Sequence, residues 1–217
     1  YYKLWVNGEF VGMGPAPSYT FRYCYNKIDI SSYLKPGRNV IAVHTYYQGL
    51  INRVWVSGDN LHMFCCALDI GGKRVLESDK NWKYAYHTGY SHLDTTGYET
   101  QFLERYNAGA PEVGFEEPDF DDSDWCYAVE AVNSPHTLVE QKTSMLVFET
   151  LQPASVRQEG ETVIFDLGQM VVGYPSFVVK GAKGEVVDIF CGQELNSDGS
   201  VRYKLRCNCE YAEKMVL

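Results

Sequence analysis

The fold class of this chain is decided by residues 163–199, whose sequence is VIFDLGQMVVGYPSFVVKGAKGEVVDIFCGQELNSDG. Ser176–Lys180 and Glu185–Phe190 are rich in β-branched and aromatic residues, which are typical of strands. The GAKG stretch between them carries two glycines that suit a tight turn. The segment therefore predicts an antiparallel hairpin, flanked by more polar and glycine residues than a strand pair needs.

The first half of the chain also consists of short predicted strands separated by turns. Tyr1–Val6 enters an Asn7-Gly8 turn, and residues 39–47, NVIAVHTYY, form an almost continuous apolar run that predicts a central strand. Residues 63–77 predict another hairpin, with a glycine pair at its tip. Short helices are expected only near 30–34 and 121–123. The predicted fold class is all-β.

Composition and charge argue against several classes of function. The chain has 217 residues and a formal net charge of -9, and 45% of its residues are hydrophobic. Affinity for nucleic acid comes from clustered Lys and Arg, so no nucleic-acid partner is expected. No apolar run approaches the roughly 20 residues of a membrane-spanning helix. The seven cysteines lack the regular spacing of a disulfide framework, and we expect mostly free, buried thiols.

Two motifs flank the predicted hairpin. A D-x-G-Q-x-x-x-G pattern precedes it, formed by Asp166, Gly168, Gln169 and Gly173. Glu194 and Leu195 follow it, ahead of an Asp198-Gly199 turn. With both motifs in this order, residues 146–217 resemble the concanavalin-like β-sandwich domain of bacterial α-L-rhamnosidases. The motif residues, Gly199 included, are expected to have structural roles in turns and in docking.

The first half resembles the jelly-roll domains attached to many glycoside hydrolases. That resemblance rests on WVNGEFVGMG and IDISSYLKPGRNVIAV within residues 5–43. PDFDDSDW at 118–125 resembles an element of the rhamnosidase N-terminal domain, and Phe120 and Trp125 are expected to anchor its turn. Together the resemblances imply two β-sandwich domains: a carbohydrate-binding-module-like jelly roll over 1–135, truncated at its start, and a concanavalin-like sandwich over 146–217, truncated at its end. Residues 86–118 are expected to form long loops on the first domain.

Some rhamnosidase N-terminal domains are similar to rhamnose-binding modules, in which a G-E-x-Y-D-A-R loop lies at the sugar site, sometimes with calcium. Residues 103–109 correspond to that loop, with Glu104 and Tyr106 retained and Asn107 in place of the acidic residue. Because asparagine is uncharged, calcium is only weakly favoured, and no cofactor or metal is predicted. The acidic turn 119–124 lacks the EF-hand pattern and is interpreted as capping carboxylates. Further candidates for stacking on a sugar, each with packing in the sheet as the alternative, are Tyr47, Trp55 and Tyr98.

The resemblance also implies where the chemistry lies. In α-L-rhamnosidases the general acid and base are glutamates of a helical domain that follows the β-domains, and this domain is expected to be absent here. We therefore expect a non-catalytic accessory portion, whose parent hydrolyses terminal α-L-rhamnose by inversion. The expected partners are a rhamnose-containing oligosaccharide or glycoside and the downstream catalytic domain.

Two alternatives stay open: a stand-alone carbohydrate-binding or docking module, and a purely structural scaffold of a different glycosidase. A family resemblance alone does not separate them, because one fold can serve several functions. The location, in the bacterial cytoplasm or the periplasm, also stays open.

Overall fold

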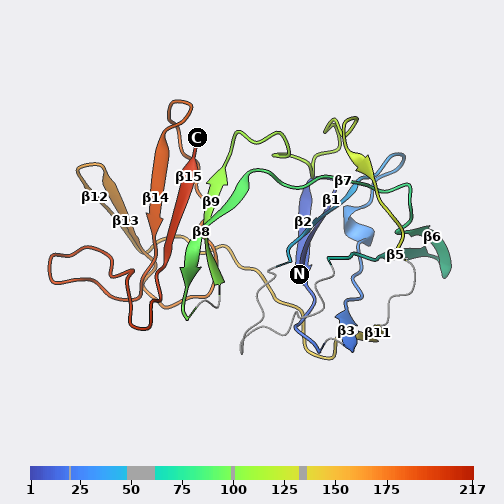
Figure 1. The fold of residues 1–217 in the computed structure, drawn as a ribbon, viewed down its shortest axis with the longest axis horizontal. Helices are drawn as coiled ribbons and strands as arrows, with labels where there is room; N and C mark the ends of the chain where they lie inside the picture. Colours follow the sequence, from blue (N-terminus) through green and yellow to red (C-terminus); the bar gives the residue numbers. More distant parts are fainter. Residues whose placement is uncertain (20, 48–61, 99–100, 132–135) are drawn as a thin grey trace. The chain divides into compact units, whose positions relative to one another are not determined.

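The computed structural model describes residues 1–19, 21–47, 62–98, 101–131 and 136–217 (Figure 1). Within these ranges the regular structure consists of strands and one 3-10 turn, η1 (Ser31–Tyr33), near the first of the two expected short helices. The all-β fold class is confirmed. The chain forms two compact units: unit 1 comprises Tyr1–Thr88 and Glu112–Leu146, and unit 2 comprises Gly89–Pro111 and Val147–Leu217.

Unit 1 is built on an antiparallel three-stranded sheet. Its strand order is β2 (Glu9–Gly14), β1 (Tyr2–Val6) and β4 (Ile41–Thr45). Three two-stranded pairs accompany it: β3 (Arg22–Tyr25) with β11 (Thr137–Glu140), β5 (Ala67–Ile70) with β6 (Lys73–Glu77), and β7 (Lys83–Tyr84) with β10 (Cys126–Tyr127). Among the described residues β4 pairs with β1 alone, so the strand expected to be central lies at the edge of this sheet.

The core of unit 1 combines aliphatic side chains of the sheet with aromatic rings. Val6 is fully buried and Ala42, on the neighbouring strand, is 8% exposed. The Trp5 ring packs edge-to-face against Phe115, with the ring centroids 5.5 Å apart, a geometry that aromatic pairs favour. Phe120 and Trp125 pack against each other in the same way at 5.6 Å, as expected for anchors of that turn.

Asn7 links the first hairpin to the rest of unit 1. Its φ of 53° and the φ of 83° at Gly8 place both residues in the left-handed region that the tight β1–β2 turn requires. The Asn7 side chain is buried, and its Nδ2 donates to the Tyr33 carbonyl at 2.8 Å and to Asn39 Oδ1 at 2.9 Å. The Val40 amide donates to Asn7 Oδ1 at 2.9 Å. One side chain thus holds η1 and the entry to β4 against the hairpin.

Unit 2 contains a four-stranded mixed sheet and a separate hairpin. The sheet has the order β14 (Val186–Phe190), β15 (Ala212–Val216), β9 (Gln101–Asn107) and β8 (Tyr90–Thr96). β15 pairs antiparallel with β14 and parallel with β9. The hairpin joins β12 (Ser155–Glu159) to β13 (Thr162–Asp166).

One loop prediction and one strand prediction are wrong. Residues 86–118 were expected to form loops on the first domain of 1–135, but they contain β8 and β9, and residues 89–111 pack in unit 2. Their strands are completed by β15, more than a hundred residues later, a pairing that local alternation does not reveal. Residues 176–180 are not a strand, and β14 makes its ladder hydrogen bonds with β15 instead.

The expectation about the cysteines is half right. All seven thiols are free, as expected. None is buried: four are exposed and three are partly exposed. In unit 2, Cys191 directly follows β14, and Cys207 and Cys209 lie in and just after a turn, so none of the three is inside a strand of the sheet.

Replacing Asn7 by glycine is expected to lower the free energy of unfolding of unit 1 by about 2 kcal/mol, because Tyr33 and Val40 lose buried partners. Glycine keeps the positive φ available, so the change isolates the contribution of the amide. Urea unfolding followed by tryptophan fluorescence measures the effect. The control is Asn81→Gly, which removes an exposed amide in a turn of the same unit; an equal loss from both variants would contradict the role given to Asn7.

Candidate carbohydrate-binding site

One face of the unit 2 sheet brings together polar and aromatic side chains from β8 and β9. The register pairs Tyr90 with Tyr106 and His92 with Glu104, and side chains of paired residues lie on the same face. The Tyr90 and Tyr106 rings are 4.9 Å apart between centroids. Rings with a polar tip beside a carboxylate can cover the C–H face of a sugar and bind its hydroxyl groups.

A second carboxylate, on β15, reaches the same face. Glu213 Oε2 accepts a hydrogen bond from the Glu104 backbone amide at 3.1 Å. Burial raises the pKa of Glu213, and the nearby charge of Glu104 raises this pKa further. Glu213 was not a candidate from the sequence, because only the pairing of β15 with β9 brings it next to Glu104.

The other unit 2 candidates lie at opposite ends of the β8–β9 pair. Asn107 ends β9, and its Oδ1 accepts from the Gly109 amide at 3.0 Å, which closes a local turn. Tyr98 follows β8 at the far end, with a φ of 60° and 62% of its surface exposed. Since a strand rises about 3.4 Å per residue, Tyr98 lies roughly 20 Å from Tyr106. Tyr98 and Tyr106 therefore cannot both contact the same monosaccharide.

The two remaining aromatic candidates do not add to this face. Tyr47 belongs to unit 1, where its ring stacks on His62 with the centroids 5.7 Å apart. Trp55 lies outside the described residues. The candidate face thus consists of Tyr90, His92, Glu104, Tyr106 and Glu213, of which Glu104 and Tyr106 belong to the sugar-site loop motif identified in the sequence.

The first family motif stabilises the end of the β12–β13 hairpin. Asp166 Oδ1 accepts from the Gly168 amide at 2.8 Å, and the Asp166 carbonyl accepts from the Ala154 amide at 2.7 Å. Gly168 has a φ of 68°, and a Cβ there would come within 3.2 Å of the Ala154 Cβ, so the turn suits glycine. Gln169 and Gly173 are exposed, and a Cβ on Gly173 would meet no atom within 4 Å.

The second motif forms a turn of its own. Glu194 pairs with Arg202, and the Arg202 amide donates to the Glu194 carbonyl at 2.9 Å. Asp198 Oδ1 accepts from both the amide and the hydroxyl of Ser200, which holds the pKa of Asp198 below its ordinary value. Gly199, with a φ of 85°, offers its carbonyl to Arg157 of β12 at 2.8 Å. Arg157 therefore connects the β12–β13 hairpin, which ends in the first motif, to the second motif.

A cluster of ionisable groups in unit 1 was not predicted from the sequence. His87 Nδ1 lies 4.0 Å from Glu112 Oε2, and the His44 and His87 rings are 5.3 Å apart between centroids. Burial opposes ionisation of Glu112, but hydrogen bonds from Thr88 outweigh it and lower the pKa of the carboxyl. Burial and the neighbouring histidine lower the pKa of His44 to about 4, so this imidazole is neutral at ordinary pH.

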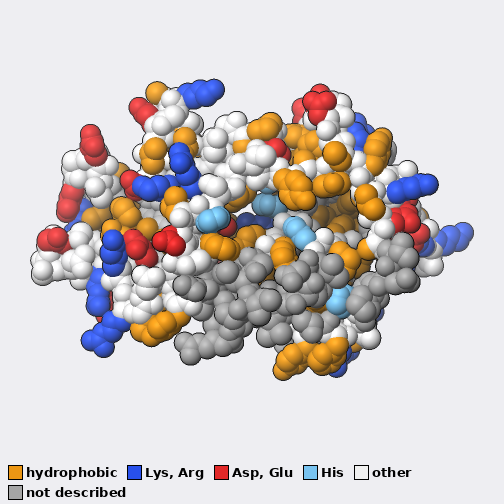
Figure 2. Space-filling model, viewed as in Figure 1, with side chains coloured by type: hydrophobic (Ala, Val, Ile, Leu, Met, Phe, Trp, Pro, Cys, Tyr) orange, Lys and Arg blue, Asp and Glu red, His pale blue; other side chains and the backbone are white. Residues whose placement is uncertain are grey.

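The described residues contain no group of three or more His, Cys, Asp or Glu that could hold a metal ion. In the acidic turn, Asp121 Oδ1 accepts from the Ser123 amide at 3.0 Å, which is a capping contact. No described helix is long and apolar enough to cross a membrane. On the face drawn in Figure 2, Lys and Arg lie dispersed among Asp and Glu and form no continuous basic surface.

Replacing Glu213 by glutamine is expected to flatten the pH dependence of stability. Because the pKa of Glu213 is raised in the folded state, protonated Glu213 contributes to the free energy of unfolding. This contribution is fully present below the ordinary pKa of 4.5 and is lost as the pH rises through the folded-state pKa. Glutamine retains an acceptor for the Glu104 amide but carries no charge. Thermal unfolding midpoints measured from acid to neutral pH should therefore fall less for the variant. Glu161→Gln, in the exposed β12–β13 turn, is the control and should follow the wild type; parallel curves for Glu213→Gln and the wild type would refute this account.

Two protein-family models match the chain. The Alpha-L-rhamnosidase N-terminal domain matches residues 1–148, and the Bacterial alpha-L-rhamnosidase concanavalin-like domain matches residues 156–215. An α-L-rhamnosidase of Streptomyces avermitilis is 28% identical over 219 aligned residues, which cover 92% of this chain and 20% of the relative. One from Alteromonas sp. (strain LOR) is 34% identical over 96 residues, which cover 43% of this chain and 10% of the relative.

Solved structures of rhamnosidases are also similar to this chain. A GH78 family rhamnosidase of Bacillus sp. GL1 is 27% identical, with a TM-score of 0.61 over 72% of this chain and 17% of that chain. An α-L-rhamnosidase from Aspergillus terreus, 22% identical, shares the fold with a TM-score of 0.68 over 100% of this chain and 26% of that chain. This chain thus spans about a fifth or less of the length of the curated relatives named above. It belongs to the α-L-rhamnosidase family, of which it carries the N-terminal and concanavalin-like domains.

Proposed function

We propose that this chain is a non-catalytic accessory part of a larger α-L-rhamnosidase-like glycoside hydrolase. The observation that carries the proposal is that the carboxylates of both family motifs are engaged in their own turns, Asp166 with Gly168, Glu194 with Arg202 and Asp198 with Ser200. The parent would hydrolyse terminal α-L-rhamnose from an oligosaccharide or glycoside by inversion. Its general acid and base would belong to a helical domain elsewhere in the longer chain.

The chemistry of inversion supports this assignment of roles. An inverting glycosidase needs two carboxyl groups roughly 6.5–9.5 Å apart, with room for a water molecule between the base and the sugar. Asp166 instead accepts from the Gly168 amide, and Glu194 pairs with Arg202. A carboxylate committed to such a contact holds a turn in place and has little freedom to exchange protons with a substrate.

Apolar side chains on the surface of unit 2 support docking to another part of the parent. Val147, Val172 and Val178 are 85%, 105% and 92% exposed. Met170 and Tyr174, close to Val172 in sequence, are 76% and 60% exposed. Exposed apolar surface of this kind marks sites where another protein surface packs. We assign this surface to contact with the remainder of the rhamnosidase chain.

The 217-residue protein is expected to release no 4-nitrophenol from 4-nitrophenyl α-L-rhamnopyranoside above the rate of a protein-free blank, because its motif carboxylates serve turns. Absorbance of the released nitrophenolate measures the rate. A full-length α-L-rhamnosidase is the positive control. If the protein does release 4-nitrophenol, and Asp166→Asn or Glu194→Gln abolishes that release, the non-catalytic role is wrong.

Carbohydrate binding is a second candidate function, favoured by the face that carries Tyr90, Glu104 and Tyr106. This face offers the surfaces of two tyrosine rings, tilted against each other, and a carboxylate acceptor on adjacent strands. The site that we propose does not include calcium, because the side-chain oxygen of Asn107 accepts the hydrogen bond from Gly109 in its own turn. The ligand would be a terminal rhamnose or a related sugar.

Isothermal titration with L-rhamnose is expected to give a measurable binding heat at millimolar sugar, and Tyr90→Leu should weaken binding about tenfold by removing one aromatic surface and its hydroxyl. Tyr127→Leu is the matched control, because it replaces an exposed tyrosine of unit 1. The absence of heat from the wild-type protein would remove the binding function and favour a purely structural role for both units.

A further inference from the structure

Two cysteines of unit 2 lie in one tight turn. The turn runs from Arg206 to Cys209 and is closed by a hydrogen bond from the Cys209 amide to the Arg206 carbonyl at 3.3 Å. Its two central residues, Cys207 and Asn208, have φ values of 64° and 55°. Positive φ at both central positions is the conformation of a type I′ turn, in which Asn and Gly are the usual residues. Cysteine rarely takes such a position, and an uncommon backbone conformation points to a function.

The left-handed conformation of Asn208 brings the two cysteines close together. A residue in a helical conformation, of either hand, places the Cα atoms of its two neighbours roughly 5.4 Å apart. Cα atoms that are joined by a disulfide are usually about 4.4–6.8 Å apart, so a disulfide can close here with little movement of the backbone. Both thiols are free, and Cys207 is exposed while Cys209 is partly exposed. A small molecule in solution can therefore reach the pair.

The same turn anchors the chain to the end of β8. The Asn208 carbonyl accepts from the Gly97 amide at 2.7 Å and from the Thr96 hydroxyl at 2.6 Å. The Glu210 amide donates to Thr96 Oγ1 at 2.7 Å, and Thr96 is 1% exposed. β15 begins at Ala212, two residues after Glu210. A covalent link across the turn would restrict its conformations and so would hold this contact with β8 in place.

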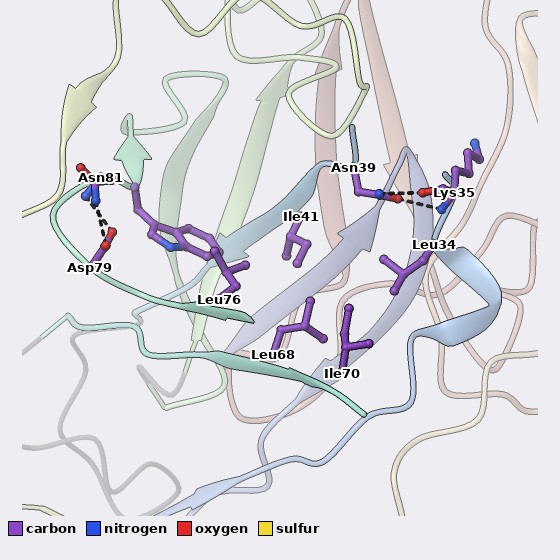
Figure 3. Close-up of a pocket in the computed structure, with 10 residues that line it drawn as sticks. Leu34, Lys35, Asn39, Ile41, Leu68, Ile70, Leu76, Asp79 and Asn81 are labelled. Atoms are coloured by element: carbon purple, nitrogen blue, oxygen red, sulfur yellow. Dashed lines mark hydrogen bonds between the residues drawn. The ribbon is translucent and has the colours of Figure 1, made fainter. Parts of the chain in front are cut away.

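The adjacent cysteines Cys65 and Cys66 of unit 1 lack this geometry. The Cys66 carbonyl accepts from the Ser78 amide at 3.0 Å, which extends the β5–β6 ladder. Figure 3 shows that Leu68 of β5 points toward Ile41 of β4; strand alternation places Cys66 on the same side as Leu68 and Cys65 on the opposite side. Burial raises the pKa of Cys66 to about 11, so little of this thiol is the reactive thiolate near neutral pH. This pair is therefore an internal control.

We propose that Cys207 and Cys209 form a redox-sensitive dithiol, which exchanges with glutathione disulfide or a similar small disulfide and closes a disulfide across the turn. The Cys207 thiolate attacks one sulfur of glutathione disulfide, which forms a mixed disulfide and releases one glutathione thiolate. The Cys209 thiolate then attacks the Cys207 sulfur, closes the Cys207–Cys209 bond and releases the second glutathione. The two cysteines are oxidised, glutathione disulfide is reduced to two thiols, and the two cysteine protons end on these thiols. In the oxidised state the contact of the turn with β8 is locked.

Mass spectrometry of the 217-residue protein, equilibrated with mixtures of glutathione and glutathione disulfide and then digested with trypsin, tests the proposal. Cleavage after Arg206 and Lys214 releases CNCEYAEK, residues 207–214, which contains no other cysteine. We expect this peptide to lose the mass of two hydrogens. The peptide of residues 54–73, which carries the adjacent pair, should stay reduced or gain glutathione. Only glutathione adducts on 207–214, or an equal internal disulfide in 54–73, would overturn the proposal.

Two substitutions of Asn208 test the role of the turn. Asn208→Gly keeps the positive φ available and should form the disulfide as the wild type does. Asn208→Val disfavours the left-handed conformation and should lower the equilibrium constant for closure about tenfold. Circular dichroism checks that both variants are folded. Equal closure in the two variants would contradict the part given to the turn.

Hydrogen exchange of the wild-type protein measures the effect of the disulfide on the β8 contact and needs no variant. Oxidation should slow exchange of the Gly97 and Glu210 amides about tenfold, because a cross-linked turn opens less often. The amide of Gly160, in the separate β12–β13 turn of the same unit, should exchange at the same rate in both redox states. Unchanged exchange at Gly97 and Glu210 in the oxidised protein would contradict the locked contact.

Discussion

The parallel pairing of β15 with β9 is the interaction on which unit 2 depends. It joins residues 101–107 to residues 212–216, with Lys214, Met215 and Val216 opposite Arg105, Tyr106 and Asn107. Without it the β8–β9 hairpin and the β14–β15 pair would be two isolated ribbons, and a two-stranded ribbon is only marginally stable in water. The pairing also creates the candidate site, because it places Glu213 beside Glu104 on one face of the sheet.

Unit 1 depends on a few hydrogen bonds between residues that are distant in the sequence. The β1–β2 hairpin has an Asn-Gly turn, and the buried side-chain amide of Asn7 in this turn forms hydrogen bonds with residues 33, 39 and 40. This contact also sets the start of β4 at Ile41. One buried side chain therefore links the β1–β2 turn to η1 and to the start of β4.

The arrangement of carboxylates separates turn-forming roles from possible binding roles. Asp166, Asp198 and Asp121 each accept a hydrogen bond from the backbone two residues later, the usual Asx geometry of turns. Glu104 and Glu213 are different: they lie on paired strands, and burial together with the charge of Glu104 raises the pKa of Glu213. A carboxylate pair on a sheet face can meet a ligand, whereas a carboxylate that closes a turn is already satisfied.

The sequence by itself determined the all-β class, the turns at Asn7-Gly8 and Gly71-Gly72, and the family, because these follow from local strand propensity, glycine conformation and motif order. It also indicated Glu104 and Tyr106, through a motif with fixed spacing. Only the tertiary structure decided which strands pair: β8 and β9 join unit 2, residues 176–180 are not a strand, and β14 pairs with β15. The physical reason is that strand pairing between distant segments depends on the whole sheet's hydrogen bonds and packing. The position of Glu213 beside Glu104 and the separation of Tyr98 from Tyr106 both follow from that pairing.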